Sequence, residues 1–156
     1  MSFTRYFRTF ENCKPEQVKN RLLRRVRPCN ARSEQGADLS CTIGASHTGY
    51  HGLFPKVTHS REWRLRSGAL EVIDTLRGRF KQAKAYFYFH PAVRVTIVDG
   101  RITFALPLGR RGDVFVDGGE AEVVDSTWHP GFGVSRPNKC LVVGFREASV
   151  RTRFVY

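Results

Sequence analysis

Residues capable of acid–base chemistry gather between Ser46 and Gly78, in the stretch SHTGYHGLFPKVTHSREWRLRSGALEVIDTLRG. This stretch holds His47, His51 and His59, together with Tyr50. A neutral histidine has a pKa suited to proton transfer near pH 7, and a tyrosine can serve where a nearby cation lowers its pKa. We therefore predict that His47, Tyr50 and His59 contribute to a substrate-binding site in a polar loop. The alternative is that Tyr50 packs at a sheet edge while the histidines bond backbone groups.

Three arginines follow the histidines, and they alternate with apolar residues. We interpret Arg61, Arg64 and Arg66 as projecting from one face of a sheet. Guanidinium groups bind carboxylate and sulfate in a bidentate manner, so this row could line a groove for an acidic ligand. The alternative is an ordinary solvated face.

A strand, a tight turn and a second strand must position these side chains. Trp63 and Leu65 alternate with arginines, which is the period of a half-buried strand. Ser67-Gly68 then predicts a hairpin turn, because glycine tolerates the positive φ that such turns require. Asp74 falls on the core-facing positions of the returning strand, where a carboxylate needs partners. We expect Arg77 or a backbone turn to supply them.

The same short-strand pattern continues along the chain, with turn residues every 8–12 positions. Asp99-Gly100 predicts a second two-residue hairpin. Stretches that favour a loop are Asn30–Asp38 and Trp128–Gly133. Stretches that favour a strand are Leu39–Ala45, Ala85–His90, Val93–Ile97, Ile102–Leu106, Cys140–Phe145 and Val150–Tyr156. The sequence predicts an all-β fold, an antiparallel β-sandwich of about nine or ten short strands, with little or no helix except near the N-terminus.

Composition sets the class of partner. The 156 residues carry 26 Lys and Arg against 14 Asp and Glu, a net charge of +12 that favours polyanions such as nucleic acid or acidic polysaccharide. A solvated basic surface without a partner is the alternative. The first residues, MSFTRYFRTFE, lack the apolar segment of an export signal, and no apolar run approaches a membrane span.

Metal and cofactor chemistry is not expected. The four cysteines, at 13, 29, 41 and 140, form no Cys-x-x-Cys pair, so we predict neither a structural zinc site nor a redox motif, and we expect Cys41 and Cys140 to be buried thiols. The spacing of His47, His51 and His59 matches no zinc pattern. We predict no metal and no cofactor.

Several motifs in order resemble the C-terminal β-sandwich of the heparinase II/III-like polysaccharide lyases. The resemblance covers roughly residue 20 to the end and is carried by the order and spacing of the motifs, not by any single motif. These motifs are Arg24-Arg25-Val26-Arg27-Pro28, Ala45-Ser46-His47-Thr48-Gly49-Tyr50, His59-Ser60-Arg61, Trp63–Arg66, Leu70–Gly78, Phe89-His90-Pro91 and Pro130-Gly131-Phe132-Gly133.

The resemblance implies an eliminase that acts on an acidic polysaccharide, such as heparan sulfate, alginate or a related uronate polymer. In that family an Asn or His counters the uronate carboxylate, a Tyr or His takes the C5 proton, and a Tyr protonates the leaving oxygen. A neutralised carboxylate makes the adjacent carbon acidic enough for a positioned base. An α-helical toroid precedes the sheets, and the groove lies between them.

This sequence departs from the family pattern in two respects. It has neither the helical toroid nor the family's His-x-His-x-Asp segment, so we assign no catalytic residue. We expect a poorly defined segment over 1–20 and a sheet domain over 21–156 that is a fragment of a lyase, with acidic polysaccharide and the missing toroid as partners. Full-length members of the family are periplasmic or cytoplasmic in bacteria. The alternative is a basic β-domain that binds nucleic acid or another polyanion without chemistry.

Overall fold

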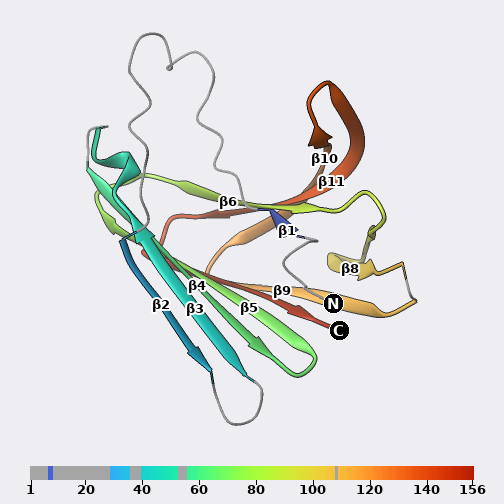
Figure 1. The fold of residues 1–156 in the computed structure, drawn as a ribbon, viewed down its shortest axis with the longest axis horizontal. Helices are drawn as coiled ribbons and strands as arrows, with labels where there is room; N and C mark the ends of the chain where they lie inside the picture. The colour runs from blue at the N-terminus through green and yellow to red at the C-terminus, as the bar shows by residue number, and fades with distance from the viewer. Residues whose placement is uncertain (1–6, 9–28, 36–39, 53–55, 108) are drawn as a thin grey trace.

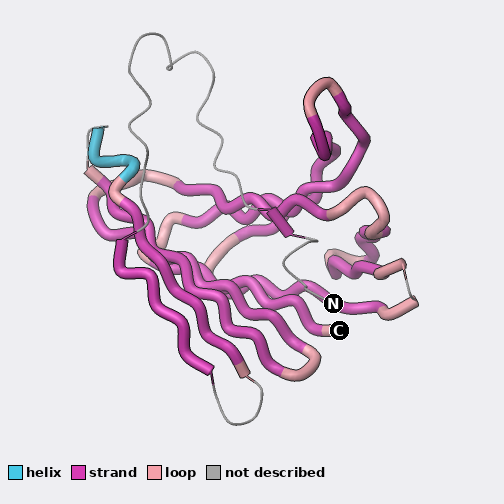
Figure 2. Tube along the Cα trace, viewed as in Figure 1, coloured by secondary structure: helices cyan, strands magenta, loops and turns pink. Residues whose placement is uncertain are grey.

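Antiparallel strands make up 74% of the structure, a computed structural model that describes residues 7–8, 29–35, 40–52, 56–107 and 109–156 (Figure 2). One short 3₁₀ helix within these ranges, η3 (Gly49–Gly52), interrupts them. The strands are β1 (Phe7–Arg8), β2 (Cys29–Gln35), β3 (Cys41–His47), β4 (Val57–Arg66), β5 (Ala69–Gly78), β6 (Ala83–Phe89), β7 (Arg94–Val98), β8 (Arg101–Ala105), β9 (Arg111–Asp117), β10 (Glu120–Gly131), β11 (Val134–Phe145) and β12 (Ser149–Val155).

The strands form two stacked sheets. One has eight strands in the order β2-β3-β4-β5-β12-β9-β8-β7, and the other has four in the order β1-β6-β11-β10. Figure 1 shows the four-stranded sheet lying across the larger one, with the β10–β11 hairpin turning away from both. The predicted antiparallel sandwich is confirmed, although the described residues alone contain twelve strands, more than the nine or ten expected.

Two glycine turns confirm the hairpin predictions. Gly68 has a φ of 73° in the connection between β4 and β5. Asp99 and Gly100 have φ values of 50° and 76° between β7 and β8, as a two-residue turn of the mirror-image type requires. These turns fix which residues lie opposite one another on the paired strands.

Aromatic side chains fill the space between the two sheets. Phe87 and Phe89 of β6 are buried against Phe104 and Phe154 of the larger sheet. The Phe87 and Phe154 ring centroids are 5.5 Å apart, and those of Phe104 and Phe154 are 6.3 Å apart. Burial of each such ring stabilises the fold by about 1.5–3 kcal/mol, so this cluster contributes much of the energy that packs the two sheets together.

Two stretches predicted as loops are strands. Residues 30–35 belong to β2, and Trp128 belongs to β10, which continues to Gly131. β2 is an edge strand that pairs with β3 alone among the described strands, and its described side chains are exposed, so it shows no apolar alternation. Backbone pairing with β3 makes it a strand.

β7 forms the other edge of the eight-stranded sheet. Ile97 and Val98 on this strand are 52% and 55% exposed.

Most of the predicted N-terminal segment and the basic cluster ending at Pro28 lie outside the described residues. Within the described chain, no helix has the length and apolar character needed to cross a membrane.

Candidate functional site

The predicted histidine site lies where β3, β4 and β5 run side by side. The register places His47 of β3 directly opposite His59 of β4. It also places Arg61 of β4 directly opposite Asp74 of β5. Side chains directly opposite one another on antiparallel strands have Cβ atoms about 4.5–5.5 Å apart, so these four groups can contact in sequence across the sheet.

Asp74 is the shared acceptor of this cluster. Its Oδ1 accepts from His59 Nε2 at 2.7 Å and from Arg61 Nε at 2.6 Å, and its Oδ2 accepts from Arg61 Nη2 at 2.8 Å. The Asp74 residue is 1% exposed, and His59 and Arg61 are 8% exposed. Such a bidentate pair satisfies a buried guanidinium and a buried carboxylate together.

The pKa of Asp74 lies below its ordinary value. Burial acts to raise that pKa, but the hydrogen bond from His59 and the positive charge of Arg61 outweigh it. Asp74 is therefore a carboxylate at neutral pH.

A second hydrogen bond extends the cluster to His47 and determines where its protons lie. The Gly49 N–H donates to His47 Nδ1 at 3.2 Å, so this nitrogen is unprotonated. In a neutral ring the proton is then on His47 Nε2, which donates to His59 Nδ1 at 3.0 Å. His59 in turn carries its proton on Nε2, facing Asp74. When both imidazoles are neutral, these bonds give them the same tautomer.

Arg61 points into the molecule, not along the surface. Its guanidinium carbon lies 5.3 Å from the Phe87 ring centroid of the other sheet and 6.0 Å from that of Trp63. The prediction that Arg61, Arg64 and Arg66 share one face is wrong. Arg61 is an odd number of residues from the other two, and in a strand such residues point to opposite faces.

Arg64 belongs to a row of ion pairs on the opposite face of the eight-stranded sheet. We call this row the arginine ladder; its members come from β2, β4, β5 and β12 and are Arg32, Glu62, Arg64, Glu71 and Arg151. Arg64 donates to Glu62 at 2.6 Å and to Glu71 at 3.2 Å. Arg66 is exposed beside the β4–β5 turn.

The ladder also shifts the pKa of its own members. Burial acts to raise the pKa of Glu62, but hydrogen bonds from Arg64 and Arg32 lower it overall. The pKa of Arg64 is raised, chiefly by its bond to Glu62. The charges of this face therefore neutralise one another to a large extent.

Tyr50 and His51 lie on η3, just beyond the cluster. The rings of His47 and Tyr50 have centroids 5.3 Å apart and are tilted by 51°. His51 is exposed, and its Nε2 lies 2.8 Å from Thr58 Oγ1. The structure thus brings His47, Tyr50, His59 and Arg61 together, and it separates them from Arg64 and Arg66.

The partners predicted for Asp74 are wrong, since His59 and Arg61 take the place of Arg77 or a backbone turn. The alternative in which the histidines bond backbone groups holds for His47 Nδ1 but not for the His47–His59–Asp74 bonds. The missed signal is the turn at Ser67-Gly68. Counting outward from it along both strands places Arg61 opposite Asp74.

Comparison with solved structures identifies the fold. The heparan sulfate lyase HepC from Pedobacter heparinus matches 83% of this chain with a TM-score of 0.63 and 10% identity, and a mutant of that enzyme matches with a TM-score of 0.65 and 11% identity. Heparinase III matches 80% of this chain with a TM-score of 0.59 and 11% identity. The fold is that of a heparinase-like β domain.

The chain covers only part of the enzymes that its fold resembles. The chain spans 21% of the length of HepC and of heparinase III. No protein-family model matches the sequence, and no curated protein matches it.

The domain's described residues contain no group of three or more His, Cys, Asp or Glu side chains placed to hold a metal ion. Cys140 is a buried free thiol as predicted, whereas the free thiol of Cys41 is only partly buried.

Proposed function

We propose that this chain is the sheet domain of a polysaccharide lyase, formed by residues 21–156, that acts by β-elimination on an acidic, uronate-containing polysaccharide. In this proposal the domain supports one side of the substrate groove and performs no chemistry by itself. The observation that carries the proposal is the shared fold with a heparan sulfate lyase and with heparinase III over about four-fifths of the chain. Because the chain spans a fifth of those enzymes, the proposed partner is a helical domain of the same enzyme.

The saturated histidine cluster supports a non-catalytic role. β-Elimination needs a group that neutralises the uronate carboxylate, a base for the C5 proton and an acid for the leaving oxygen. The charge of Arg61 is matched by Asp74, and both ring nitrogens of His47 take part in hydrogen bonds. The cluster therefore suits the task of holding β3, β4 and β5 together beside a groove.

An absorbance assay for the unsaturated uronate product tests this function. With heparan sulfate, heparin and alginate as substrates, we expect product from the full-length enzyme and none from this chain alone. Product formed by this chain alone would contradict the non-catalytic role. A full-length enzyme that is inactive on every uronate polymer would contradict the lyase proposal itself.

The second candidate is a basic β-domain that binds nucleic acid or another polyanion without chemistry. The net charge of +12 favours it. Binding to DNA that is tighter than binding to heparin or alginate, and that weakens steeply with salt, would favour this candidate.

A further inference from the structure

The two outer faces of the sandwich differ in chemistry. The outer face of the eight-stranded sheet carries the arginine ladder. The outer face of the four-stranded sheet carries mainly aromatic and apolar side chains, together with Asn138 and the Lys84–Glu122 ion pair. We call this second surface the tyrosine face; its residues are Tyr86, Tyr88, Val124, Trp128, Asn138 and Val142.

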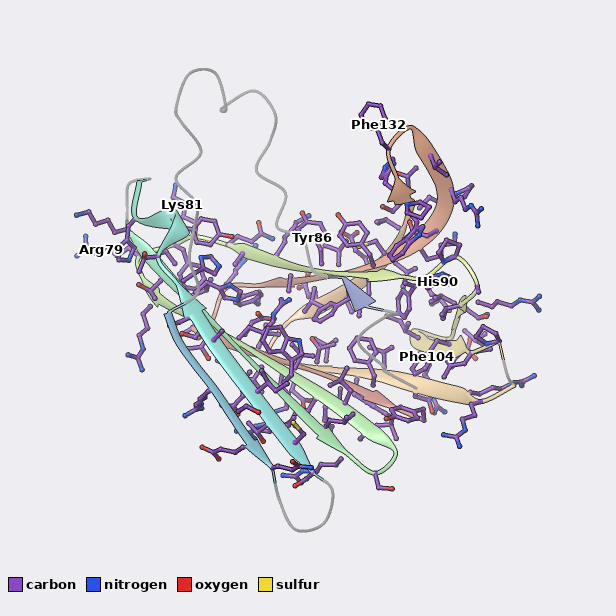
Figure 3. The ribbon with its side chains drawn as sticks, in the orientation of Figure 1. Arg79, Lys81, Tyr86, His90, Phe104 and Phe132 are labelled. Carbon is purple, nitrogen blue, oxygen red and sulfur yellow. The ribbon has the colours of Figure 1, made fainter. Side chains whose placement is uncertain are left out.

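Strand alternation places these residues on one side of the smaller sheet. Phe87 and Phe89 point into the core, so Tyr86 and Tyr88 point away from it. Figure 3 shows Tyr86 on the side of β6 that faces away from the eight-stranded sheet, whereas Phe104 lies between the sheets. The register continues the face across β11, where Tyr86 is opposite Val142.

The aromatic rings of this face form a platform. The Tyr86 and Tyr88 rings are nearly parallel, with centroids 6.5 Å apart and planes 20° apart, and both residues are half-buried. Trp128 is also half-buried and packs edge-on against His90, with centroids 5.4 Å apart. Rings that combine an apolar surface with a polar edge suit a ligand that presents both C–H faces and hydroxyl groups, as a sugar ring does.

The thiol of Cys140 lies in the same surface, opposite Tyr88 and Val124. Burial raises its pKa to about 11, so it is neutral at physiological pH. Burial likewise raises the pKa of Tyr88. Cys140 and Tyr88 are therefore uncharged at neutral pH, and the carboxylate of this face is that of Glu122, opposite Val142.

One buried polar atom on this face has no partner within the described part of the chain. Asn138 is 7% exposed, and its Nδ2 donates to the Phe89 carbonyl oxygen at 2.8 Å. Its Oδ1 accepts no hydrogen bond from any described residue. A buried acceptor left unpaired costs about 1–3 kcal/mol, so a hydroxyl group that reached it would be bound favourably. Asn138 lies on β11 two residues before Cys140, which pairs with Tyr88.

Cationic side chains stand at the ends of the platform. Lys84 precedes Tyr86 by two residues on β6, is 46% exposed at its side chain, and pairs with Glu122 at 3.7 Å. Arg136 is exposed and lies opposite Trp128. The tip of the β10–β11 hairpin, with the fully exposed Phe132, rises on the same side as Tyr86 (Figures 1 and 3). The surface thus combines aromatic rings, an acceptor without a described partner and an exposed arginine at one end.

We propose that the tyrosine face binds the sugar rings of an acidic polysaccharide. The rings stack on Tyr86, Tyr88 and Trp128, and the carboxylate or sulfate groups lie toward Arg136, because Lys84 is already paired with Glu122. A sugar hydroxyl donates to Asn138 Oδ1. This assignment rests on the proposed function and replaces the predicted arginine row with a different surface as the place of contact.

Matched aromatic substitutions test the assignment. The probes are oligosaccharides derived from heparin and alginate, with single-stranded DNA of equal charge for comparison, and binding is measured by titration calorimetry. We expect Tyr86→Ala and Trp128→Ala each to weaken glycan binding about fivefold or more, and Tyr86→Phe to retain most of it. The control is Phe115→Ala, which removes a 41% exposed ring near Arg153 on the opposite outer face. Thermal unfolding verifies that each variant is folded.

The outcomes separate the two proposals. If the native chain binds the acidic oligosaccharides and Tyr86→Ala binds them equally well, the tyrosine face is not the site while the proposed function stands. The tyrosine face is also excluded as the site if Phe115→Ala weakens binding as much as Tyr86→Ala. If the native chain binds no acidic oligosaccharide, the glycan-groove function fails as well. Tighter binding of DNA that is lost in Tyr86→Ala would assign the face to nucleic acid and overturn the glycan assignment.

Discussion

At the scale of single residues, Asp74 holds the predicted site together. One carboxylate accepts hydrogen bonds from a histidine and an arginine on the neighbouring strand, and it is the deepest charged group of the cluster. Removing either partner of a buried ion pair leaves the other charge without compensation, which costs far more than the pair itself contributes.

We therefore expect Asp74→Ala to lower the free energy of unfolding at pH 7 by about 3–5 kcal/mol. Urea unfolding measures the change. Arg64→Ala serves as the control, because its side chain is 38% exposed and its ion pairs are open to water. That variant is expected to lose about 1 kcal/mol or less. Equal losses in the two variants would contradict the central role of Asp74.

The lowered pKa of Asp74 gives this stabilisation a defined pH dependence. The stabilisation is complete above the pKa of an unfolded aspartate, about 3.9, and is lost as the pH falls through the lower pKa of the folded state. The difference in unfolding free energy between the native protein and Asp74→Ala should stay constant from pH 7 to about pH 5 and shrink below about pH 4. A difference that grows on acidification would be inconsistent with a lowered pKa.

At the scale of secondary-structure elements, the sequence predicts strands well where glycine turns or alternating residues mark them. The hairpins at Ser67-Gly68 and Asp99-Gly100 are correct because few residues other than glycine accept their backbone angles. The strand β2 is not predictable in this way, because its described side chains, those of residues 32–35, are all exposed and create no apolar pattern. The predicted face of Arg61 is wrong because the prediction grouped the three arginines by residue type. Residues an odd number of positions apart in a strand point to opposite faces, and this spacing is visible in the sequence.

The strand β9 packs closely against its neighbours at Gly112, which leads to a prediction about this element. Gly112 of β9 lies opposite Phe104, and a Cβ at this position would run into the Phe104 ring and the Val155 carbonyl oxygen. We expect Gly112→Ala to destabilise the fold by about 1–3 kcal/mol, since neither neighbour can retreat without disturbing the core.

Gly131→Ala is the matched control, because no described atom lies within 4 Å of a Cβ placed there. Thermal unfolding of both variants checks the expectation. A loss of stability in the Gly131 variant equal to that at Gly112 would show that close packing is not the cause.

At the scale of the whole molecule, the sandwich has one outer face of paired charges and one of aromatic rings. The net charge of +12 predicts a polyanion as the partner but does not say which surface meets it. Many of the arginines that produce this charge are neutralised by neighbours on adjacent strands, and only the register shows which. The stretch that holds the candidate site could therefore be located from the sequence. Which of its side chains lie on the inner and which on the outer face of the eight-stranded sheet could not.

Because β7 is an edge of the eight-stranded sheet, a strand from a second molecule can pair with it. The outer row of backbone N–H and C=O groups on β7 pairs with no strand of the described chain, and Ile97 and Val98 beside it are exposed. An extended, apolar segment of another molecule can add there as a further strand. We expect Ile97→Lys to reduce concentration-dependent aggregation measured by light scattering without lowering the unfolding temperature. Unchanged aggregation would show that molecules meet through some other surface.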